Sequence, residues 1–311
     1  MVRPFRFGIN VRTAGSAAEW ADKARKVERL GYSVLLVPDH LAELLAPFPA
    51  LVAAAAATTR LRVGTGVLNN DLRHPLLTAR EAATLDVLSD GRLELGIGAG
   101  HMQSEYAQMG LAFDAGATRV ERLAEAVVIV KRLLEGEAVS VAGRHYRVTA
   151  HTLHPRPIQR PRPPLFIGGN APRLLAVAAR EADIVGLTGI AFRRGGAQPD
   201  VSDFRPAAVD ERVRLLRETA AGRFEQLELN ALVQRVIVTD DRHKAAQELT
   251  ARWPHLTADD LLASPYVLLG TVDQLVDNLR ARRDRWGISY VMTHEPFMDA
   301  LAPVVARLAG R

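Results

Sequence analysis

The stretch from Thr84 to His101, TLDVLSDGRLELGIGAGH, constrains the fold of this chain more than any other. It begins as the end of a helix, because its two leucines are three residues apart and share a face. Three turn-forming residues, Ser89-Asp90-Gly91, end that pattern, and a short strand follows at 92–97. Glycines crowd the end of the strand, where they predict close approach of a ligand to the backbone. A helix that leads into such a strand is one repeating unit of a closed α/β fold.

The rest of the chain repeats this step. Apolar runs that end in glycine or polar residues predict eight strands, at 5–9, 33–37, 61–68, 92–97, 165–169, 182–187, 227–238 and 289–293. Helical periodicity separates them, with capping boxes expected at Ser16-x-x-Glu19, Thr118-x-x-Glu121 and Thr271-x-x-Gln274. We therefore expect an α/β protein, a (β/α)8 TIM barrel in a single domain over residues 1–311, with insertions after strands 4 and 6.

The two expected insertions differ in character. Residues 139–148, around Gly143, predict a small hairpin outside the main sheet. Residues 189–206 show no periodicity and predict a long loop, which we interpret as a lid over a bound ligand. Arg193 and Arg194 would attract anionic groups to it. An unstructured insertion without a role is the alternative.

A doubly wound open sheet is the competing fold. It would carry a dinucleotide-binding fingerprint after a strand, and Gly96-Ile-Gly98 begins like one. His101 stands where the third glycine should be, so the match is partial and indicates little.

Composition excludes several classes of function. The chain of 311 residues has no cysteine, so disulfides, thiolate nucleophiles and cysteine-based metal centres are excluded. His294-Glu295 begins like a zinc-protease motif, but no second histidine follows, and we expect no metal. The net charge of +5 comes from scattered arginines rather than from one basic stripe, so we expect no nucleic-acid partner. No apolar run is long enough to span a membrane, and we expect a cytoplasmic protein.

Candidate site residues are those at the carboxyl ends of the predicted strands, where barrels of this type carry their active sites. They are Asn10, Asp39, His40, Gly66, Val67, Asn69, Gly98, Ala99, Gly100, His101, Gly168, Gly169, Thr188, His294 and Glu295. His40 is the best candidate for proton transfer, since imidazole titrates in the useful range. A strand-end histidine satisfied by its neighbours is the alternative interpretation. The glycine clusters suit phosphate binding by backbone N–H groups, or else form tight turns without a ligand.

Several runs of sequence together resemble the bacterial luciferase-like family of flavin and deazaflavin oxidoreductases. These runs are GYSVLLVPDH, RVGTGVLNNDLRHP, ATLDVLSDGRLELGIGAG, PPLFIGGNAP and LLGTVDQLVDNL, in the expected order between residues 5 and 294. The Asp39-His40 ending resembles the branch that uses the deazaflavin coenzyme F420 more than the flavin mononucleotide (FMN) branch. His101 departs from the residues common at its position.

The resemblance implies an oxidoreductase that transfers a hydride between coenzyme F420 and a small organic substrate. An FMN-dependent monooxygenase and a flavin-binding protein without turnover are the alternatives. It also implies a homodimer, a cis peptide at Gly66-Val67 and a catalytic His40. Cofactor-binding residues would be Asp39, Gly66, Val67, Asn69, Gly98, Ala99, Gly100, Gly168, Gly169 and Thr188, and the substrate pocket would be formed by Asn10, His101, His294 and Glu295.

Overall fold

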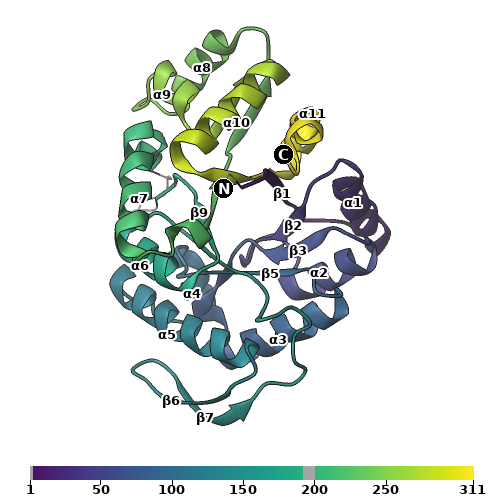
Figure 1. The fold of residues 1–311 in the computed structure, drawn as a ribbon, viewed down its shortest axis with the longest axis vertical. Coiled ribbons are helices and arrows are strands. Elements are labelled where there is room, and N and C mark those ends of the chain that lie inside the picture. The colour runs from purple at the N-terminus through teal and green to yellow at the C-terminus, as the bar shows by residue number, and fades with distance from the viewer. Residues whose placement is uncertain (1–2, 192–199) are drawn as a thin grey trace.

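The main sheet is a closed barrel of parallel strands, seen end-on in Figure 1. The computed structural model describes residues 3–191 and 200–311. The barrel strands are β1 (Arg6–Asn10), β2 (Val34–Val37), β3 (Arg62–Thr65) continued by β4 (Leu68–Asn69), β5 (Leu93–Gly98), β8 (Leu165–Gly168), β9 (Ile184–Leu187), β10 (Glu228–Leu232) and β13 (Ile288–His294). Their order is β3-β2-β1-β13-β10-β9-β8-β5, and pairing of β3 and β4 with β5 closes the ring. The predicted barrel is confirmed.

Helices surround the barrel on its outer face (Figure 1). They are α1 (Ala17–Arg29), α2 (Pro47–Ala56), α3 (Pro75–Leu88), α4 (Gln103–Gln108), α5 (Gly116–Leu134), α6 (Pro172–Glu181), α7 (Pro206–Thr219), α8 (Arg242–Thr250), α9 (Ala258–Ala263), α10 (Val272–Trp286) and α11 (Met298–Leu308). In the described part of the chain, none of them is both long and apolar enough to cross a membrane.

Successive residues of a buried strand point alternately into the barrel and toward the helices. Val34 and Leu36 of β2 belong to a small apolar cluster inside the barrel, together with Phe166 and Tyr290. Leu35, between them, packs into the larger core under the helices. Both faces are therefore apolar, which is why the strand reads as a continuous hydrophobic run.

One predicted strand is wrong. The run at 227–238 forms two strands, β10 in the barrel and β11 (Arg235–Val238) outside it. The N–H of Val233 donates to the carbonyl of Met292 in the barrel (2.7 Å), whereas the N–H of the next residue, Gln234, donates to the carbonyl of Tyr266 (2.7 Å). The chain thus leaves the barrel between these two residues. It then pairs in parallel with β12 (Val267–Gly270), a strand that the periodicity did not predict.

The capping boxes gave mixed outcomes. Thr271 and Gln274 form the expected reciprocal box at the start of α10. Ser16 caps α1, but the side chain of Glu19 accepts from Gly15 instead of completing the box. The box at Thr118 is wrong, because α5 already begins at Gly116 and has no side-chain cap.

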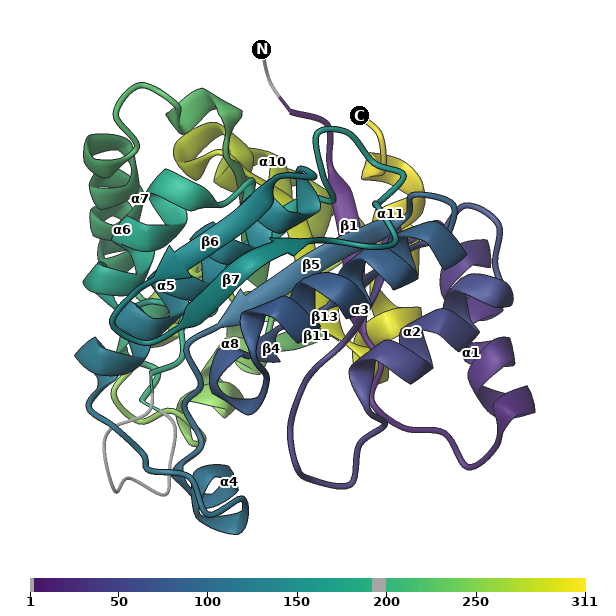
Figure 2. The ribbon, with the colours of Figure 1, turned by 90° about the horizontal axis from the view of Figure 1, so that it is seen from below.

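The two expected insertions have different outcomes. The hairpin at 139–148 is confirmed as the antiparallel pair β6 (Ala138–Ala142) and β7 (Arg147–Thr152), which lies across the outside of the molecule in Figure 2. The predicted lid at 189–206 largely lies outside the described residues, since 192–199, with Arg193 and Arg194, are not among them. Residues 200–206 include a short 3-10 turn, Ser202–Phe204.

The two ends of the chain meet at the pole of the barrel where the strands begin. Phe5 and Ala309 form a parallel bridge, and the N–H of Phe5 donates to Arg311 over 3.0 Å. In Figure 2 both ends lie at one pole, whereas α4 lies at the other, beyond the carboxyl ends of the strands. We call these the amino pole and the carboxyl pole.

Candidate active site at the carboxyl pole

The glycines that drew attention to the end of β5 are explained largely by packing within the protein. A Cβ at Gly96 would collide with the carbonyl oxygen of Thr65, and one at Gly98 would lie 2.8 Å from Val67. Gly100 has a φ of +73° and lies against Tyr106 and Asn69. The expectation that a ligand accounts for all the missing side chains is therefore too strong, because neighbouring strands already fill much of the space.

His40 is held by a buried carboxylate. Its Nδ1 lies 2.9 Å from Oε1 of Glu105, on α4, and Glu105 is only 3% exposed. The same oxygen accepts from the N–H of Leu41 over 3.0 Å. Because this oxygen acts as an acceptor, Nδ1 of His40 must be the donor, which leaves Nε2 as the atom that can take up a proton. His40 is partly exposed at the barrel mouth.

His101 lies beside His40. The two rings are perpendicular, with centroids 5.3 Å apart. The side chain of His101 is exposed to solvent, although neighbouring groups still desolvate its ring in part. This desolvation, together with the proximity of His40 and Arg119, lowers the pKa of His101 to about 4. The structure thus brings together two imidazole rings, His40 beside the carboxylate of Glu105 and His101 near the guanidinium of Arg119.

Asp39 is already engaged by protein groups. It is buried, and its Oδ2 accepts from Nη1 of Arg73 (2.5 Å) and from the backbone N–H of Asn69 (3.0 Å). The side chain of Asn69 in turn accepts from the N–H of Asp71 (3.1 Å). Asn69 thereby caps the short 3-10 turn Asn70–Leu72. Asp39 therefore ties the end of β2 to the turn after β4.

Two buried polar atoms at this pole lack a hydrogen-bond partner among the described residues, Oδ1 of Asn10 and Nδ2 of Asn69. Asn10 Oδ1 lies 2.9 Å from where a Cβ at Gly66 would be, beside the Gly66-Val67 peptide. That peptide is cis, as the resemblance implied. Leaving a buried acceptor and a buried donor unpaired is costly, so their position favours a ligand that supplies both kinds of partner.

His294 forms a second group around β1 and β13. It is the register partner of Asn10. Its Nδ1 lies 3.4 Å from Nη2 of Arg12, and its Nε2 lies 3.4 Å from Oε1 of Gln234. Burial, with the charges of Arg12 and Arg235, lowers the pKa of His294 to about 4. Arg12 and Arg235 therefore add positive charge to this side of the mouth.

The ends of β8 and β9 are joined by Asn170. Its Oδ1 accepts from the N–H of Thr188 (3.2 Å) and of Gly189 (3.3 Å), and its Nδ2 donates to the Thr188 hydroxyl (3.1 Å). Gly168 and Gly169 precede Asn170, and Gly169 has a φ of +154°. Asn170 thus holds Gly168 and Gly169 beside Thr188, as expected for one of the two predicted phosphate-binding groups, and the phosphate role stays a prediction.

Glu295 lies apart from the histidine pair. Its carboxylate pairs with Lys23 of α1 over 2.9 Å, and Lys23 also pairs with Glu19 of the same helix (3.2 Å). The structure therefore directs Glu295 toward the helix layer, and it does not bring it together with His40 or His101.

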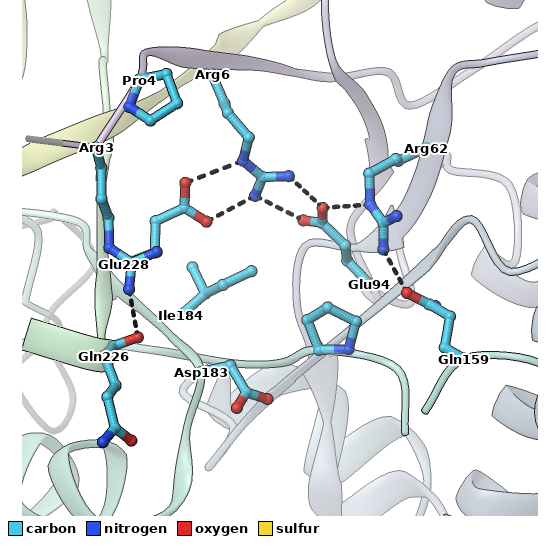
Figure 3. Close-up of a pocket in the computed structure, with 11 residues that line it drawn as sticks. Arg3, Pro4, Arg6, Arg62, Glu94, Gln159, Asp183, Ile184, Gln226 and Glu228 are labelled. Carbon is cyan, nitrogen blue, oxygen red and sulfur yellow. Dashed lines mark hydrogen bonds and ion pairs between the residues drawn. The ribbon is translucent and has the colours of Figure 1, made fainter. Parts of the chain in front are cut away.

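An open pocket of about 410 Å³ lies at the amino pole, away from these residues (Figure 3). Its floor is a network in which Arg6 lies between Glu228 and Glu94, and Glu94 also binds Arg62. We assign the chemistry to the carboxyl pole, because the ionic groups of this network are paired with one another.

Sequence reasoning missed Glu105. The residue follows the strand by several positions and lies on the short helix α4, beyond the strand ends that were searched. The signal available in the sequence was an acidic residue next to an aromatic one, Tyr106, and the structure shows both to be buried. Periodicity could not assign it to His40, because the two residues are 65 positions apart. The described residues contain no group of three acidic or histidine side chains placed to hold a metal.

A parallel barrel that gathers polar side chains at the carboxyl ends of its strands, among them a histidine paired with a buried carboxylate, has the architecture of TIM-barrel enzymes. Comparison with known proteins then gives the family. The chain belongs to the luciferase-like monooxygenase family, whose model matches residues 1–290. The predicted family is confirmed.

Individual relatives agree with this placement. A protein from Nakamurella multipartita named F420-dependent glucose-6-phosphate dehydrogenase is 29% identical, over 95% of this chain and 92% of the relative. One of the same name from Beutenbergia cavernae is 31% identical, over 73% of this chain and 66% of the relative. The solved structure of the coenzyme F420-dependent tetrahydromethanopterin reductase from Methanopyrus kandleri has a TM-score of 0.77 and 19% identity, covering 99% of each chain. This last likeness supports the fold.

Proposed function

We propose that the protein is a coenzyme F420-dependent dehydrogenase that oxidises a hydroxyl group of a small organic substrate. The observation that carries the proposal is the His40–Glu105 pair at the barrel mouth, with Nδ1 and Oε1 2.9 Å apart. The curated relatives supply the coenzyme and the reaction class, since they carry that cofactor in their names and match most of the chain.

The residues at the carboxyl pole suit the coenzyme. Its ring system carries both carbonyl and N–H groups, which complement the orphaned Nδ2 of Asn69 and Oδ1 of Asn10. We assign its anionic tail to backbone N–H groups at the segments Gly98–Gly100 and Gly168–Gly169, with Thr188 beside them. Asp39 acts by fixing the turn that carries Asn69.

When bound, the deazaflavin supplies a hydride acceptor. The task of the protein is then to remove the hydroxyl proton as the C–H bond breaks. His40 takes that proton on Nε2, because Nδ1 is engaged with Glu105. The buried carboxylate stabilises the imidazolium that forms, since it is a fixed charge at hydrogen-bond distance. Catalysis by a positioned base of this kind contributes roughly 10²–10⁴-fold.

A phosphate-bearing substrate suits the positive side of the mouth. Among the described residues, three arginines take part in no ion pair with an acidic side chain: Arg12, Arg235 and Arg252. Burial, and then the nearby charge of Arg252, lowers the pKa of Arg235. Like charges gathered without a counterion favour an anionic ligand. Glucose 6-phosphate, named in the relatives, is therefore the first substrate to test.

The test is a pair of parallel measurements on the purified protein. In the first, coenzyme F420 and FMN are titrated separately, and we expect F420 to bind at least about tenfold more tightly, roughly 1.4 kcal/mol. In the second, reduction of F420 is followed with glucose 6-phosphate and with neutral alcohols. Equal or reversed affinities, or oxygen uptake with reduced FMN, would instead support the monooxygenase function of the family.

A matched pair of variants sharpens the result. His40→Ala removes the proposed base, whereas His243→Ala removes an exposed histidine on α8, outside the site. We expect only the first to abolish F420 reduction while F420 still binds. Coenzyme binding without turnover in the unaltered protein, on every alcohol tried, would support a binding protein.

A further inference from the structure

Helix α4 projects at the carboxyl pole, where it follows the end of β5 (Figure 2). It has only six residues, and its first turn has no side-chain cap. Four of the six are exposed, whereas Glu105 and Tyr106 are only 3% and 1% exposed. So short a helix is not stable on its own, and its place therefore depends mainly on the contacts of these two side chains.

The two buried side chains of α4 reach different strand ends, because consecutive residues of a helix point roughly 100° apart. Oε1 of Glu105 lies 2.9 Å from Nδ1 of His40 and accepts from the N–H of Leu41 over 3.0 Å, at the end of β2. The hydroxyl of Tyr106 donates to Oδ2 of Asp71 over 2.9 Å, in the turn after β4. The helix therefore connects the ends of β2 and β4 through neighbouring residues.

Asp71 is itself fixed by other groups. Its side chain is 3% exposed, and Oδ2 also accepts from Nη1 of Arg122 on α5 over 2.6 Å. Its backbone N–H donates to Oδ1 of Asn69 over 3.1 Å. Burial and the charge of Asp71 raise the pKa of Tyr106, so the hydroxyl stays protonated and can donate. A hydrogen bond to an ionised carboxylate is among the stronger kinds, and this one fastens α4 to the turn.

We propose that Tyr106 is a positioning residue for His40. Its hydroxyl holds α4 against Asp71, and the helix thereby keeps the carboxylate of Glu105 at Nδ1 of His40. The proton-acceptor role of His40 rests on the proposed function, whereas the arrangement of its ring does not. The ring of Tyr106 also packs edge to face against Phe113, with centroids 4.9 Å apart, and removal of the hydroxyl alone leaves this packing in place.

The consequence for His40 is a fixed tautomer. A neutral imidazole carries one proton, which either nitrogen can hold. The carboxylate of Glu105 fixes that proton on Nδ1 and leaves Nε2 as the acceptor. If α4 moves away, both tautomers become populated, and the N–H of Leu41 loses the same carboxylate oxygen. The tautomer of His40 and the amide exchange of Leu41 therefore both report on the hold of Tyr106.

The first test needs neither coenzyme nor substrate. Nuclear magnetic resonance of the imidazole nitrogens is recorded at about pH 9, well above the ordinary histidine pKa, and the His40 signals are assigned from their loss in His40→Asn. In the unaltered protein we expect a protonated Nδ1 and an unprotonated Nε2. Tyr106→Phe should give a mixture of tautomers and amide exchange at Leu41 at least about threefold faster. Glu105→Ala gives the reference for complete loss of the contact.

The matched control is Tyr146→Phe. The hydroxyl of Tyr146, between β6 and β7, accepts from Nδ2 of Asn70 over 2.9 Å. It therefore contacts the same turn as Tyr106 does, but from the hairpin rather than from α4. We expect Tyr146→Phe to leave the His40 tautomer and the Leu41 exchange unchanged. A single tautomer in Tyr106→Phe, or an equal disturbance in Tyr146→Phe, would overturn the proposal.

The second test measures turnover with F420 and glucose 6-phosphate. We expect Tyr106→Phe to lower kcat by about 3- to 30-fold with KM nearly unchanged, because the lost hydrogen bond affects the base rather than a substrate contact. Since Tyr106 acts through Glu105, adding Tyr106→Phe to Glu105→Gln should lower kcat little further. Losses that simply add would overturn the proposal, because residues that act independently behave in that way.

Failure of this proposal and failure of the proposed function give different results. If the unaltered protein reduces no F420 with any alcohol, the dehydrogenase function is wrong, while the tautomer and the amide exchange still decide whether Tyr106 positions His40. If turnover is normal and Tyr106→Phe keeps the single tautomer, only the positioning role is wrong.

Discussion

The two poles of this barrel differ in how fully their buried polar groups are paired. At the amino pole, Glu94 is 1% exposed and accepts from Arg6 over 2.6 Å and from Arg62 over 2.7 Å. At the carboxyl pole, Asn10 and Asn69 each leave one buried polar atom unpaired among the described residues. Ionic groups that are paired with one another stabilise the fold and leave little capacity for a ligand. Buried amide atoms without a partner retain the capacity to bind one. The difference indicates that the open pocket of Figure 3 is a structural closure of the barrel.

The largest expected effect separates the poles by activity. His40→Ala should lower turnover by roughly 10²–10⁴-fold, because it removes the proton acceptor, while F420 affinity changes little. Steady-state kinetics and a coenzyme titration measure the two quantities. Activity close to that of the unaltered protein would leave His40 with a structural role, and the contrast between the poles would lose its main support.

The next effect should appear as stability at the opposite pole. Glu94→Ala leaves Arg6 and Arg62 without their shared partner, and breaking a buried pair costs about 3–5 kcal/mol. We expect up to about 3 kcal/mol of unfolding free energy, because the two arginines are 25% and 26% exposed and solvent replaces part of the loss. Urea unfolding measures it. Turnover per folded molecule should stay unchanged, and a large fall in turnover would give the amino pole a catalytic role.

A smaller effect tests the carboxylate behind His40. Glu105→Gln keeps the shape of the side chain but removes the charge that holds Nδ1. A hydrogen bond to a charged group contributes about 1.5–3 kcal/mol, so kcat should fall by roughly 10- to 100-fold. Rapid-mixing kinetics of F420 reduction would resolve the step. An unchanged kcat would mean that Glu105 serves only to anchor α4.

The smallest effect concerns pH and stability. Because the folded pKa of His294 is about 4, below the usual value for histidine, the unfolded chain binds a proton first as pH falls. Stability from this site is thus full above about pH 6.5 and is lost progressively down to about pH 4. His294→Asn should flatten the fall in unfolding free energy in that window. An identical pH dependence in both proteins would show that the ring is not kept neutral by the fold.

At the amino pole, Glu94 makes the stability of the fold depend on pH as well. Burial alone would raise the pKa of Glu94, but Arg6 and Arg62 outweigh it and lower the pKa below the ordinary value. Its contribution to stability is therefore present above the unfolded pKa and is lost as pH falls through the folded one. We expect acid unfolding of Glu94→Gln, followed by circular dichroism, to depend less on pH below about 4.5 than that of the unaltered protein.

Local sequence signals predicted the repeat of strands and helices because buried parallel strands read as apolar runs. The same signal merged β10 with β11, since two apolar strands separated only by Val233 and Gln234 look like one. Whether such a run stays in one sheet depends on partners far away, here Met292 and Tyr266. Strand pairing of this kind is not encoded within a short window.

The candidate site was predicted in outline only. Strand ends located His40, His101, Asn10 and His294, because the carboxyl ends of parallel strands share one pole. Glu105 lay beyond those ends, and its pairing with His40 depends on where a short helix folds back. The glycine signal was correctly noticed, yet much of its cause lies in contacts between strands.

The meeting of the two chain ends has a practical consequence. Phe5 pairs with Ala309 at the amino pole, so the polypeptide is nearly a closed loop. A partner domain or surface linker fused at either end would emerge on the side away from the carboxyl pole. The ends could also be joined by a short linker and the chain reopened in an outer turn, such as that around Gly143, since termini that lie together tolerate circular permutation. Immobilisation through either end would thus leave the carboxyl pole facing the solution.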